Sequence, residues 1–176
     1  MTDPLDSIEA QLEPRRNFDT PPLDKWHPEL SGDIPIVIKA DGTWYHDGDP
    51  IRRESLVRLF ASILRREEDG EYYLVTPVEK WRIRVELCPL LVTDADRTGD
   101  LLVVTVNTGR RVTVDAEHPL YLVPERDNAA AVALEHGLTA LFTRAAWYRL
   151  VDLAQELGGV TGVASGEEFF PLEPQH

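Results

Sequence analysis

The chain has 176 residues, of which 43% are hydrophobic and 28% charged, as in an ordinary folded protein with room for one domain or two small ones. Its 31 acidic side chains outnumber 18 basic ones, so the formal net charge is −13. Non-specific nucleic-acid binding depends on neutralising phosphates with basic side chains. Long nucleic acids and anionic membrane surfaces are therefore not expected as partners.

The N-terminus and the single cysteine predict the compartment. The first residues are acidic and lack the basic and apolar regions of a signal peptide, and no apolar run is long enough to span a bilayer. With Cys88 alone, the chain forms no internal disulfide and no cysteine zinc cluster. Neither a glycine-rich phosphate loop nor a metal-ligand pair occurs in the sequence. We expect a cytoplasmic protein without cofactor or metal, present as a monomer or homodimer.

The N-terminal part predicts a short helix followed by an extended arm. Residues 4–13 are typical of a helix, and residues 15–35 are rich in proline, which favours extended chain. Phe18, Leu23 and Trp26 indicate that the arm is ordered, because a flexible linker seldom contains such side chains.

A hairpin and a helix are predicted next. Asp41-Gly42 separates the β-branched run 34–38 from residues 43–46, which is typical of a hairpin. Between residues 52 and 66 the apolar side chains recur with helical spacing, and residues 68–70 end the predicted helix.

Most of the remaining chain predicts strands. Segments in which apolar and polar residues alternate, or in which β-branched residues form a run, are bounded by turn residues and indicate strands. They are 72–76, 80–86, 90–93, 101–106, 111–114, 120–123, 130–134 and 138–142. A closing helix is predicted over 144–157, where Gly158-Gly159 ends it, and residues 160–172 are expected to be extended.

A weak internal repeat accompanies these elements. Each copy is a strand, a glycine turn, and a proline followed by an apolar residue, and the copies are offset by 67 to 69 residues. The matching segments are Ile36–Ile38, Asp41-Gly42 and Asp49–Ile51 in the first copy, and Val104–Val106, Thr108-Gly109 and His118–Leu120 in the second. Hairpins also resemble one another by chance, so this repeat alone leaves duplication open.

Basic side chains concentrate in one stretch. Residues 52–97 carry nine basic and nine acidic side chains, so the rest of the chain carries the whole net charge. In the predicted strand 80–86, alternation places Lys80, Arg82 and Arg84 on one face. Arginine binds phosphate in bidentate geometry. The pattern indicates either a site for a small anion or an exposed ladder of ion pairs.

Five further residues complete the candidate ligand site. Arg53 would add positive charge, Thr76 and Glu79 would hold a ribose or base, and Trp44 or Tyr73 would offer a ring for stacking. The alternative for Trp44, which follows the Asp41-Gly42 turn, is packing over the sheet. No catalytic residues are assigned. An enzyme with Glu79 or His46 as general base is the less favoured alternative, because nothing pairs a nucleophile with a base at a recognisable spacing.

Arg144 stands at the predicted start of a helix, where a positive charge opposes the helix dipole. We expect it to have a specific partner, such as a carboxylate or a ligand.

Four segments resemble a known family. They are D-G-x-W-x-H-x-G-x-P-I-x-R at 41–53, L-V-x-L-F-A-S-I-L at 56–64, D-G-x-Y-Y-L-V-T-P-V-E-K at 69–80 and S-G-x-x-F-F-P-L at 165–172. Together they make the chain similar to the bacterial domain of unknown function 1285 (DUF1285) over about residues 26–172. The resemblance implies a duplicated α+β core whose C-terminal unit is like a pleckstrin-homology barrel. It also implies a nucleotide-like ligand bound between the two units and a role in signal transduction, and it names no catalytic residues.

The sequence therefore predicts an α+β protein of two small related units, each with antiparallel strands and a helix. We expect a helix and arm at 1–31, a first unit at 32–98 and a second, pleckstrin-homology-like unit at 99–176. The predicted function is binding of a small anionic, nucleotide-like ligand in signal transduction. The alternative is a protein-interaction adaptor, which would have a protein partner and no small-molecule ligand.

Overall fold

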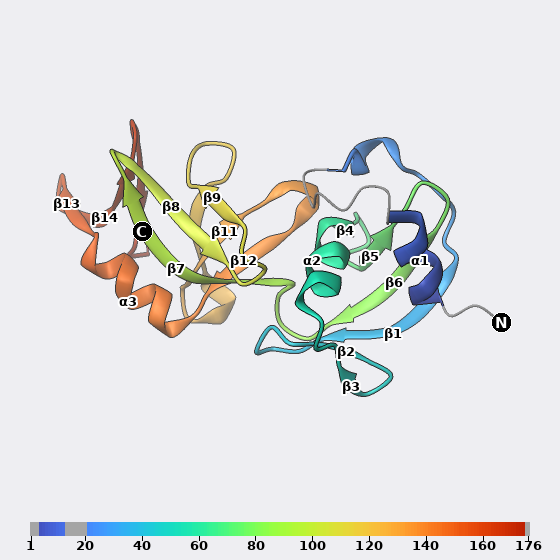
Figure 1. Ribbon diagram of the computed structural model, residues 1–176. Coiled ribbons are helices and arrows are strands. Elements are labelled where there is room, and N and C mark those ends of the chain that lie inside the picture. Colours follow the sequence, from blue (N-terminus) through green and yellow to red (C-terminus); the bar gives the residue numbers. More distant parts are fainter. Residues whose placement is uncertain (1–3, 13–20, 175–176) are drawn as a thin grey trace. The chain divides into compact units, whose positions relative to one another are not determined.

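The computed structural model describes residues 4–12 and 21–174 and confirms the α+β class with two related units (Figure 1). Unit 1 comprises residues 1–87 and unit 2 residues 88–176. The division lies between Leu87 and Cys88, whereas the sequence predicted it at 98/99. Gly99 instead forms the turn of a hairpin within unit 2, because the strands on either side of it pair with each other.

Unit 1 is built on a six-stranded sheet whose order is β3-β2-β1-β6-β5-β4. β1 and β6 pair in parallel, and every other neighbouring pair is antiparallel. The strands are β1 (Gly32–Ile38), β2 (Trp44–His46), β3 (Asp49–Pro50), β4 (Leu64–Arg66), β5 (Tyr72–Val75) and β6 (Lys80–Val85).

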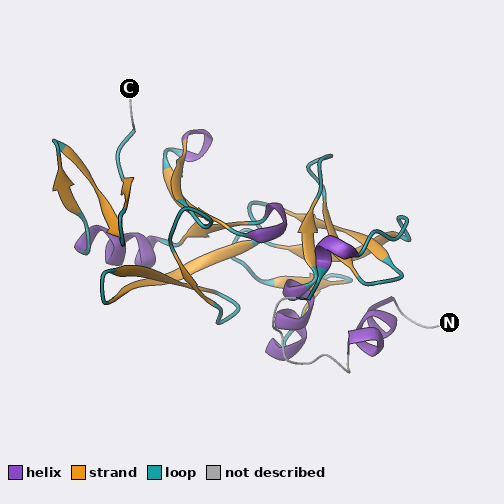
Figure 2. Cartoon of the chain, turned by 90° about the horizontal axis from the view of Figure 1, so that it is seen from above, coloured by secondary structure: helices purple, strands orange, loops and turns teal. Residues whose placement is uncertain are grey.

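Two helices, α1 (Pro4–Leu12) and α2 (Glu54–Ser62), lie on the same side of this sheet (Figure 1 and Figure 2). Ile8 of α1 and Phe60 of α2 are completely buried. The Phe60 ring stacks against Trp44 of β2, with 6.4 Å between ring centroids. These apolar contacts are the reason the two amphipathic helices form where they do.

The proline-rich segment after α1 is ordered where it is described. Leu23 lies in a single 3-10 turn (Leu23–Lys25) and is buried, as is Trp26. Arg65 of β4 donates hydrogen bonds of 2.9 Å to the main-chain carbonyls of Leu23 and Trp26. This segment therefore packs on unit 1 as predicted from its aromatic and apolar residues, while Phe18 lies outside the described residues.

Unit 2 repeats the strand plan of unit 1. Its six-stranded sheet has the order β10-β11-β12-β7-β8-β9, with β7 and β12 parallel and all other neighbours antiparallel. The strands are β7 (Leu90–Thr98), β8 (Leu101–Val106), β9 (Arg111–Thr113), β10 (Leu120–Val123), β11 (Ala129–Ala133) and β12 (Thr139–Phe142). In both sheets, two three-stranded meanders meet where the first strand of one runs parallel to the last strand of the other.

The topology corrects the register of the sequence repeat. Ile36–Ile38 lies in β1, the first strand of its sheet, but Val104–Val106 lies in β8, the second strand of the other sheet. The topological counterpart of β1 is β7. The duplication exists, but the sequence match aligned two hairpins that differ by one strand, because glycine turns between β-branched runs look alike.

The last part of unit 2 adds helix α3 (Arg144–Asp152) and a three-stranded sheet of β13 (Gln155–Leu157), β14 (Val160–Ser165) and β15 (Glu168–Pro171). α3 packs along β7, with Ala146 and Leu150 buried.

Both predicted internal helices end earlier than expected. Residues 64–66 form β4 and residues 155–157 form β13, because each segment pairs with the strand that follows it. Gly158 and Gly159 both have positive φ and form the two-residue turn between β13 and β14, not a helix cap.

No helix in the described residues is long and apolar enough to cross a bilayer.

Candidate functional site

β6 carries the basic face predicted from the sequence. Lys80, Arg82 and Arg84 alternate along it with Trp81, Ile83 and Val85. The structure gives the three basic residues different surroundings, so they do not form one continuous charged surface.

Lys80 is held in a polar network around Tyr73. Its Nζ lies 2.9 Å from the Glu67 carboxylate and 4.8 Å from the centre of the Tyr73 ring. Burial raises the pKa of Glu67, but hydrogen bonds from Lys80 and Arg65 outweigh it, and the pKa of this carboxyl is lowered. The Lys80 ammonium group is therefore largely occupied by interactions within the protein.

Tyr73 is buried, with 3% of its surface exposed, and its hydroxyl donates a hydrogen bond to the Asp69 carboxylate. This hydrogen bond, together with burial, raises the pKa of Tyr73 to about 12. Arg82 is its cross-strand neighbour on β6. The structure thus brings Tyr73, Lys80 and Arg82 together, but the Tyr73 ring has no open face for a stacking ligand.

Thr76 and Glu79 organise the turn between β5 and β6. The buried Thr76 hydroxyl accepts hydrogen bonds from the main-chain N–H groups of Val78 and Glu79. The Glu79 carboxylate accepts hydrogen bonds from Ser7 and Gln11 of α1, at 3.1 and 2.9 Å. Both predicted ligand-holding groups are therefore already used within unit 1.

Trp44 and Arg53 lie apart from the basic face of β6. Trp44 is only 2% exposed and packs against Phe60, so it corrects the prediction of a stacking surface: it is a core residue. Its indole N–H has no hydrogen-bond partner among the described residues. Arg53 precedes α2 and forms an ion pair with Glu9 of α1.

His46, the other residue considered as a base, has its Nε2 3.6 Å from the Asp47 carboxylate.

Arg82 and Arg84 flank an open depression of about 410 Å³ in unit 1. It lies where the pairing of β1 with β6 is irregular: Asp33 lies opposite Arg82 and Val37 opposite Arg84, so β1 has extra residues between two close positions of β6. Pro35, which has no N–H to donate, occurs within this bulge. The bulge opens the sheet beside Ile83, which also lines the depression.

The two arginines of the depression differ in their partners. Arg82 Nε lies 2.7 Å from the Asp33 carboxylate. Arg84 is exposed and forms no ion pair within the described residues. The acidic side chains at the rim are Asp33 and Glu71. The depression therefore has one guanidinium group that is paired with Asp33 and one that has no ion-pair partner among the described residues. This arrangement is suited to binding a small anion.

Sequence reasoning missed Asp33 and Tyr72, which also line this depression. Pro35 within a predicted strand was the available indication of a bulge. Nothing in the sequence indicated that β1 would pair with β6, because that contact joins distant parts of the chain.

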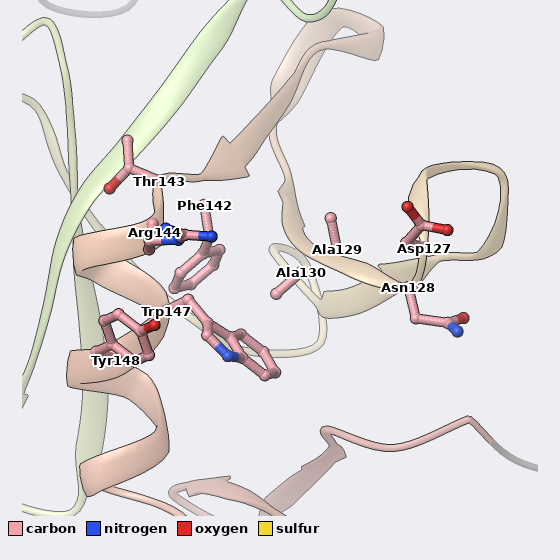
Figure 3. A pocket seen from close by; sticks show the side chains of 9 residues that line it. All are labelled: Asp127, Asn128, Ala129, Ala130, Phe142, Thr143, Arg144, Trp147 and Tyr148. Atoms are coloured by element: carbon pink, nitrogen blue, oxygen red, sulfur yellow. The ribbon is translucent and has the colours of Figure 1, made fainter.

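A second pocket, of about 390 Å³, lies in unit 2 beside the first turn of α3 (Figure 3). It is lined by Asp127, Asn128, Ala129, Ala130, Phe142, Thr143, Arg144, Trp147 and Tyr148. The Thr143 hydroxyl caps α3 by accepting a hydrogen bond from the main-chain N–H of Ala146. Arg144, which the sequence predicted to have a specific partner, forms no ion pair in the part of the chain that the structure describes.

Comparisons with known proteins identify both units. A family model for the N-terminal domain of DUF1285, a domain of unknown function, matches residues 21–87, and one for the C-terminal domain matches residues 89–172. Among functionally curated proteins, no sequence matches the chain.

Two crystal structures of DUF1285 family proteins are similar to the chain. The one from Silicibacter pomeroyi DSS-3 is 39% identical, with a TM-score of 0.78, and the match covers 86% of each chain. The one from Shewanella baltica OS155 is 36% identical, with a TM-score of 0.58, and the match covers 68% of this chain and 91% of that one.

Proposed function

The chain belongs to the DUF1285 family, and from that starting point we propose that it binds a small anionic, nucleotide-like ligand and acts as a ligand-responsive module in signal transduction. The family resemblance implied a ligand between the two units. The residues that support the present proposal all belong to unit 1 and surround the depression beside Arg82 and Arg84.

The observation that carries this proposal is the position of Arg84, which has no ion-pair partner among the described residues, next to Arg82, which forms an ion pair with Asp33. Asp33 holds the Nε of Arg82, which leaves the two terminal nitrogens of that guanidinium for other acceptors. Two neighbouring guanidinium groups match the oxygens of a phosphate or carboxylate, and such charge-assisted hydrogen bonds are the strongest in proteins.

The surrounding charge limits the kind of anion. Asp33 and Glu71 stand at the rim, and the whole chain carries a net charge of −13. A long polyanion would lie over this acidic surface and be repelled, whereas a compact ligand places its charge on the two arginines alone. Tyr72 also lines this depression, and its ring, which already lies 5.6 Å from the Arg66 guanidinium, would contact a base.

The test is titration calorimetry of the whole chain with a panel of nucleotides, cyclic dinucleotides and inorganic pyrophosphate. We expect at least one of these compounds to bind. Arg84→Gln should weaken its binding about tenfold or more, as loss of a hydrogen bond between charged groups does. The stability of the variant should change by less than about 0.5 kcal/mol, since the side chain is exposed.

Arg52→Gln is the matched control. Arg52 is an exposed arginine of the same unit and does not line the depression, so its replacement makes the same change in net charge. Equal weakening by both variants would mean that only overall charge matters and would overturn the site. Lys80→Ala is a poorer test, because it would leave the Glu67 carboxylate without one of its partners.

A protein-interaction adaptor is the second candidate. Tyr148 and Val151, one turn apart on α3, are 60% and 45% exposed, and Leu157 of β13 is 58% exposed. Failure of every compound to bind, together with a protein partner whose binding is lost in Val151→Glu, would support this function instead.

A further inference from the structure

The pocket in unit 2 lies where two neighbouring strands separate. β11 pairs with β10 from Ala129 onward, but it pairs with β12 only from Ala131 onward. Before that point β12 has left β11 and follows β7 alone, and the Thr143 N–H donates to the Val92 carbonyl at 3.0 Å just before α3 begins. The space between β11 and the first turn of α3 is the pocket, and its volume of about 390 Å³ lies within the range of small-molecule sites.

The two sides of this pocket carry side chains of different size. Phe142 and Trp147 lie on the side of α3, and Ala129 and Ala130 lie across from them on β11 (Figure 3). Phe142 and Ala130 are buried, so the interior of the pocket is apolar. The alanine methyl groups leave space opposite the two rings, where a ligand ring would make the offset or edge-to-face contacts that aromatic groups favour. The apolar part of a ligand is therefore expected to be aromatic.

Arg144 supplies the charged group on the same side of the pocket. It precedes Trp147 and Tyr148 by three and four positions, so the three side chains are neighbours on one face of α3, and all three line the pocket. The positive charge of Arg144 lies at the positive end of the helix dipole, which is unfavourable, and no carboxylate in residues 4–12 or 21–174 pairs with it. A bound carboxylate would offset this charge and accept two parallel hydrogen bonds from the guanidinium group.

Asp127 limits the number of negative charges on the ligand. It is exposed, and Figure 3 shows it on the opposite side of the pocket from Arg144. Arg144 is the single basic side chain among the described residues that line the pocket. A second negative charge on the ligand would therefore find no basic partner and would be repelled by Asp127.

We propose that this pocket binds a small aromatic monocarboxylate. The ring lies against Trp147 and Phe142, and the carboxylate pairs with Arg144. Because neighbouring positions one helical turn apart are separated by only about 5–6 Å between Cβ atoms, a short linker of two or three bonds joins the ring and the carboxylate. This site belongs to unit 2 alone and does not depend on the function proposed for the arginine depression in unit 1.

Three related compounds test the proposal on the whole chain. 3-Phenylpropionate has the ring and the carboxylate, 3-phenylpropanol has the ring without the charge, and propionate has the charge without the ring. We expect 3-phenylpropionate to bind with a dissociation constant about tenfold or more below those of the other two, since one lacks the charge-assisted contact and the other buries no ring. Binding should shift the NMR signal of the Trp147 indole N–H, which Trp147→Phe identifies by its loss.

Two variants separate the charged contact from the ring contact. Arg144→Gln should weaken binding of 3-phenylpropionate to the level of 3-phenylpropanol and leave 3-phenylpropanol unchanged, which a general loss of folding would not do. Ala129→Leu fills the space opposite the rings and should weaken both ring compounds about tenfold or more. Arg111→Gln and Ala145→Leu make the same changes at exposed positions of unit 2 outside the pocket and should behave as the wild type. Arg84→Gln in unit 1 should also leave this binding unchanged.

Three results would overturn the proposal. The first is no shift of the Trp147 signal with 3-phenylpropionate. The second is binding of 3-phenylpropanol or propionate as tight as that of 3-phenylpropionate, which would remove either the charged contact or the ring contact. The third is an equal loss of binding in the pocket variants and in their controls.

Discussion

Unit 1 places helix α2 between the two meanders of its sheet, whereas unit 2 joins its meanders by a short turn and adds α3 after the last strand. Both helices nevertheless serve the same purpose, which is to cover apolar side chains of a six-stranded sheet. The comparison shows that the pairing of the strands, with its parallel central pair, is the shared feature. The covering helix can enter at either place in the chain.

The two cores are filled differently. α2 contributes Leu59 and Phe60, and Phe60 stacks on Trp44, so a few large side chains fill the core of unit 1. α3 contributes Ala146 and Leu150, and it faces a sheet whose buried residues include several alanines, among them Ala131 and Ala140. On the buried face of the covering helix, unit 2 therefore has an alanine and a leucine where unit 1 has a leucine and a phenylalanine.

The largest effect is expected from breaking the aromatic core of unit 1. Phe60→Ala should lower the free energy of unfolding by about 3–5 kcal/mol, because it opens a cavity beside Trp44. Leu150→Ala in unit 2 should cost about 2–5 kcal/mol. Amide hydrogen exchange of the two sheets measures each effect separately. We expect faster exchange only in the unit that carries the substitution; equal acceleration in both would show that the units unfold as one.

A smaller contrast concerns one buried aliphatic hydroxyl group in each unit, that of Ser165 and that of Thr76. Ser165 of β14 donates to the Val114 carbonyl at 2.6 Å and accepts from the Leu102 N–H at 2.9 Å, so it connects distant segments of unit 2. Ser165→Ala should cost about 1–3 kcal/mol, because two buried main-chain groups lose their partner. Chemical denaturation measures this loss.

Thr76 is the counterpart in unit 1, but its hydroxyl serves only the neighbouring turn, where the adjacent Val78 is largely exposed. Water can replace the lost acceptor, so Thr76→Val should cost less than Ser165→Ala, about 1 kcal/mol. The reverse order would mean that the turn before β6 matters more for stability than the connection through β14.

The sequence predicted most of the strands but not where the internal helices end. Alternation and turn residues are local features, and they indicated β1, β6 and β8 within a few residues. The segments 64–66 and 155–157 continue a helical spacing of apolar residues, yet they become strands because pairing with β5 and β14 gives them main-chain partners. A short segment of sequence shows its own preference for helix or strand, but it does not show whether pairing with another strand overrides that preference. The likeness of unit 2 to a pleckstrin-homology barrel stays a prediction.

The candidate site was predictable only in its basic strand. Alternation placed Arg82 and Arg84 on one face, but the bulge of β1 that opens the depression depends on a pairing between distant segments. The burial of Trp44 and Tyr73 likewise depends on what packs over them, namely α2 and a lysine-containing polar network. An aromatic residue next to a turn is compatible with both a surface and a core position.

The smallest expected effect compares one carboxylate in each unit as the pH falls. The Glu135 carboxylate lies 2.7 Å from Arg110 and 2.9 Å from His118, and chiefly the Arg110 guanidinium lowers its pKa to about 2 from an ordinary value of 4.5. Because the folded state holds this proton more weakly than the unfolded state, its contribution to stability is present above about pH 4.5. The contribution is lost as the pH falls toward about 2.

Glu135→Gln should therefore destabilise unit 2 by about 1 kcal/mol or less near neutral pH, as expected for a partly exposed ion pair. The difference from the wild type should vanish at the acid end of that range. Hydrogen exchange in the strands of unit 1 should be unaffected by the substitution, since Glu135 and its partners Arg110 and His118 all belong to unit 2. The carboxyl compared with it in unit 1 is Glu67, whose pKa is lowered by hydrogen bonds from Lys80 and Arg65 and which keeps both partners in this variant. A constant difference between variant and wild type across the whole pH range would mean that Glu135 acts through its shape and neutral hydrogen bonds, not its charge.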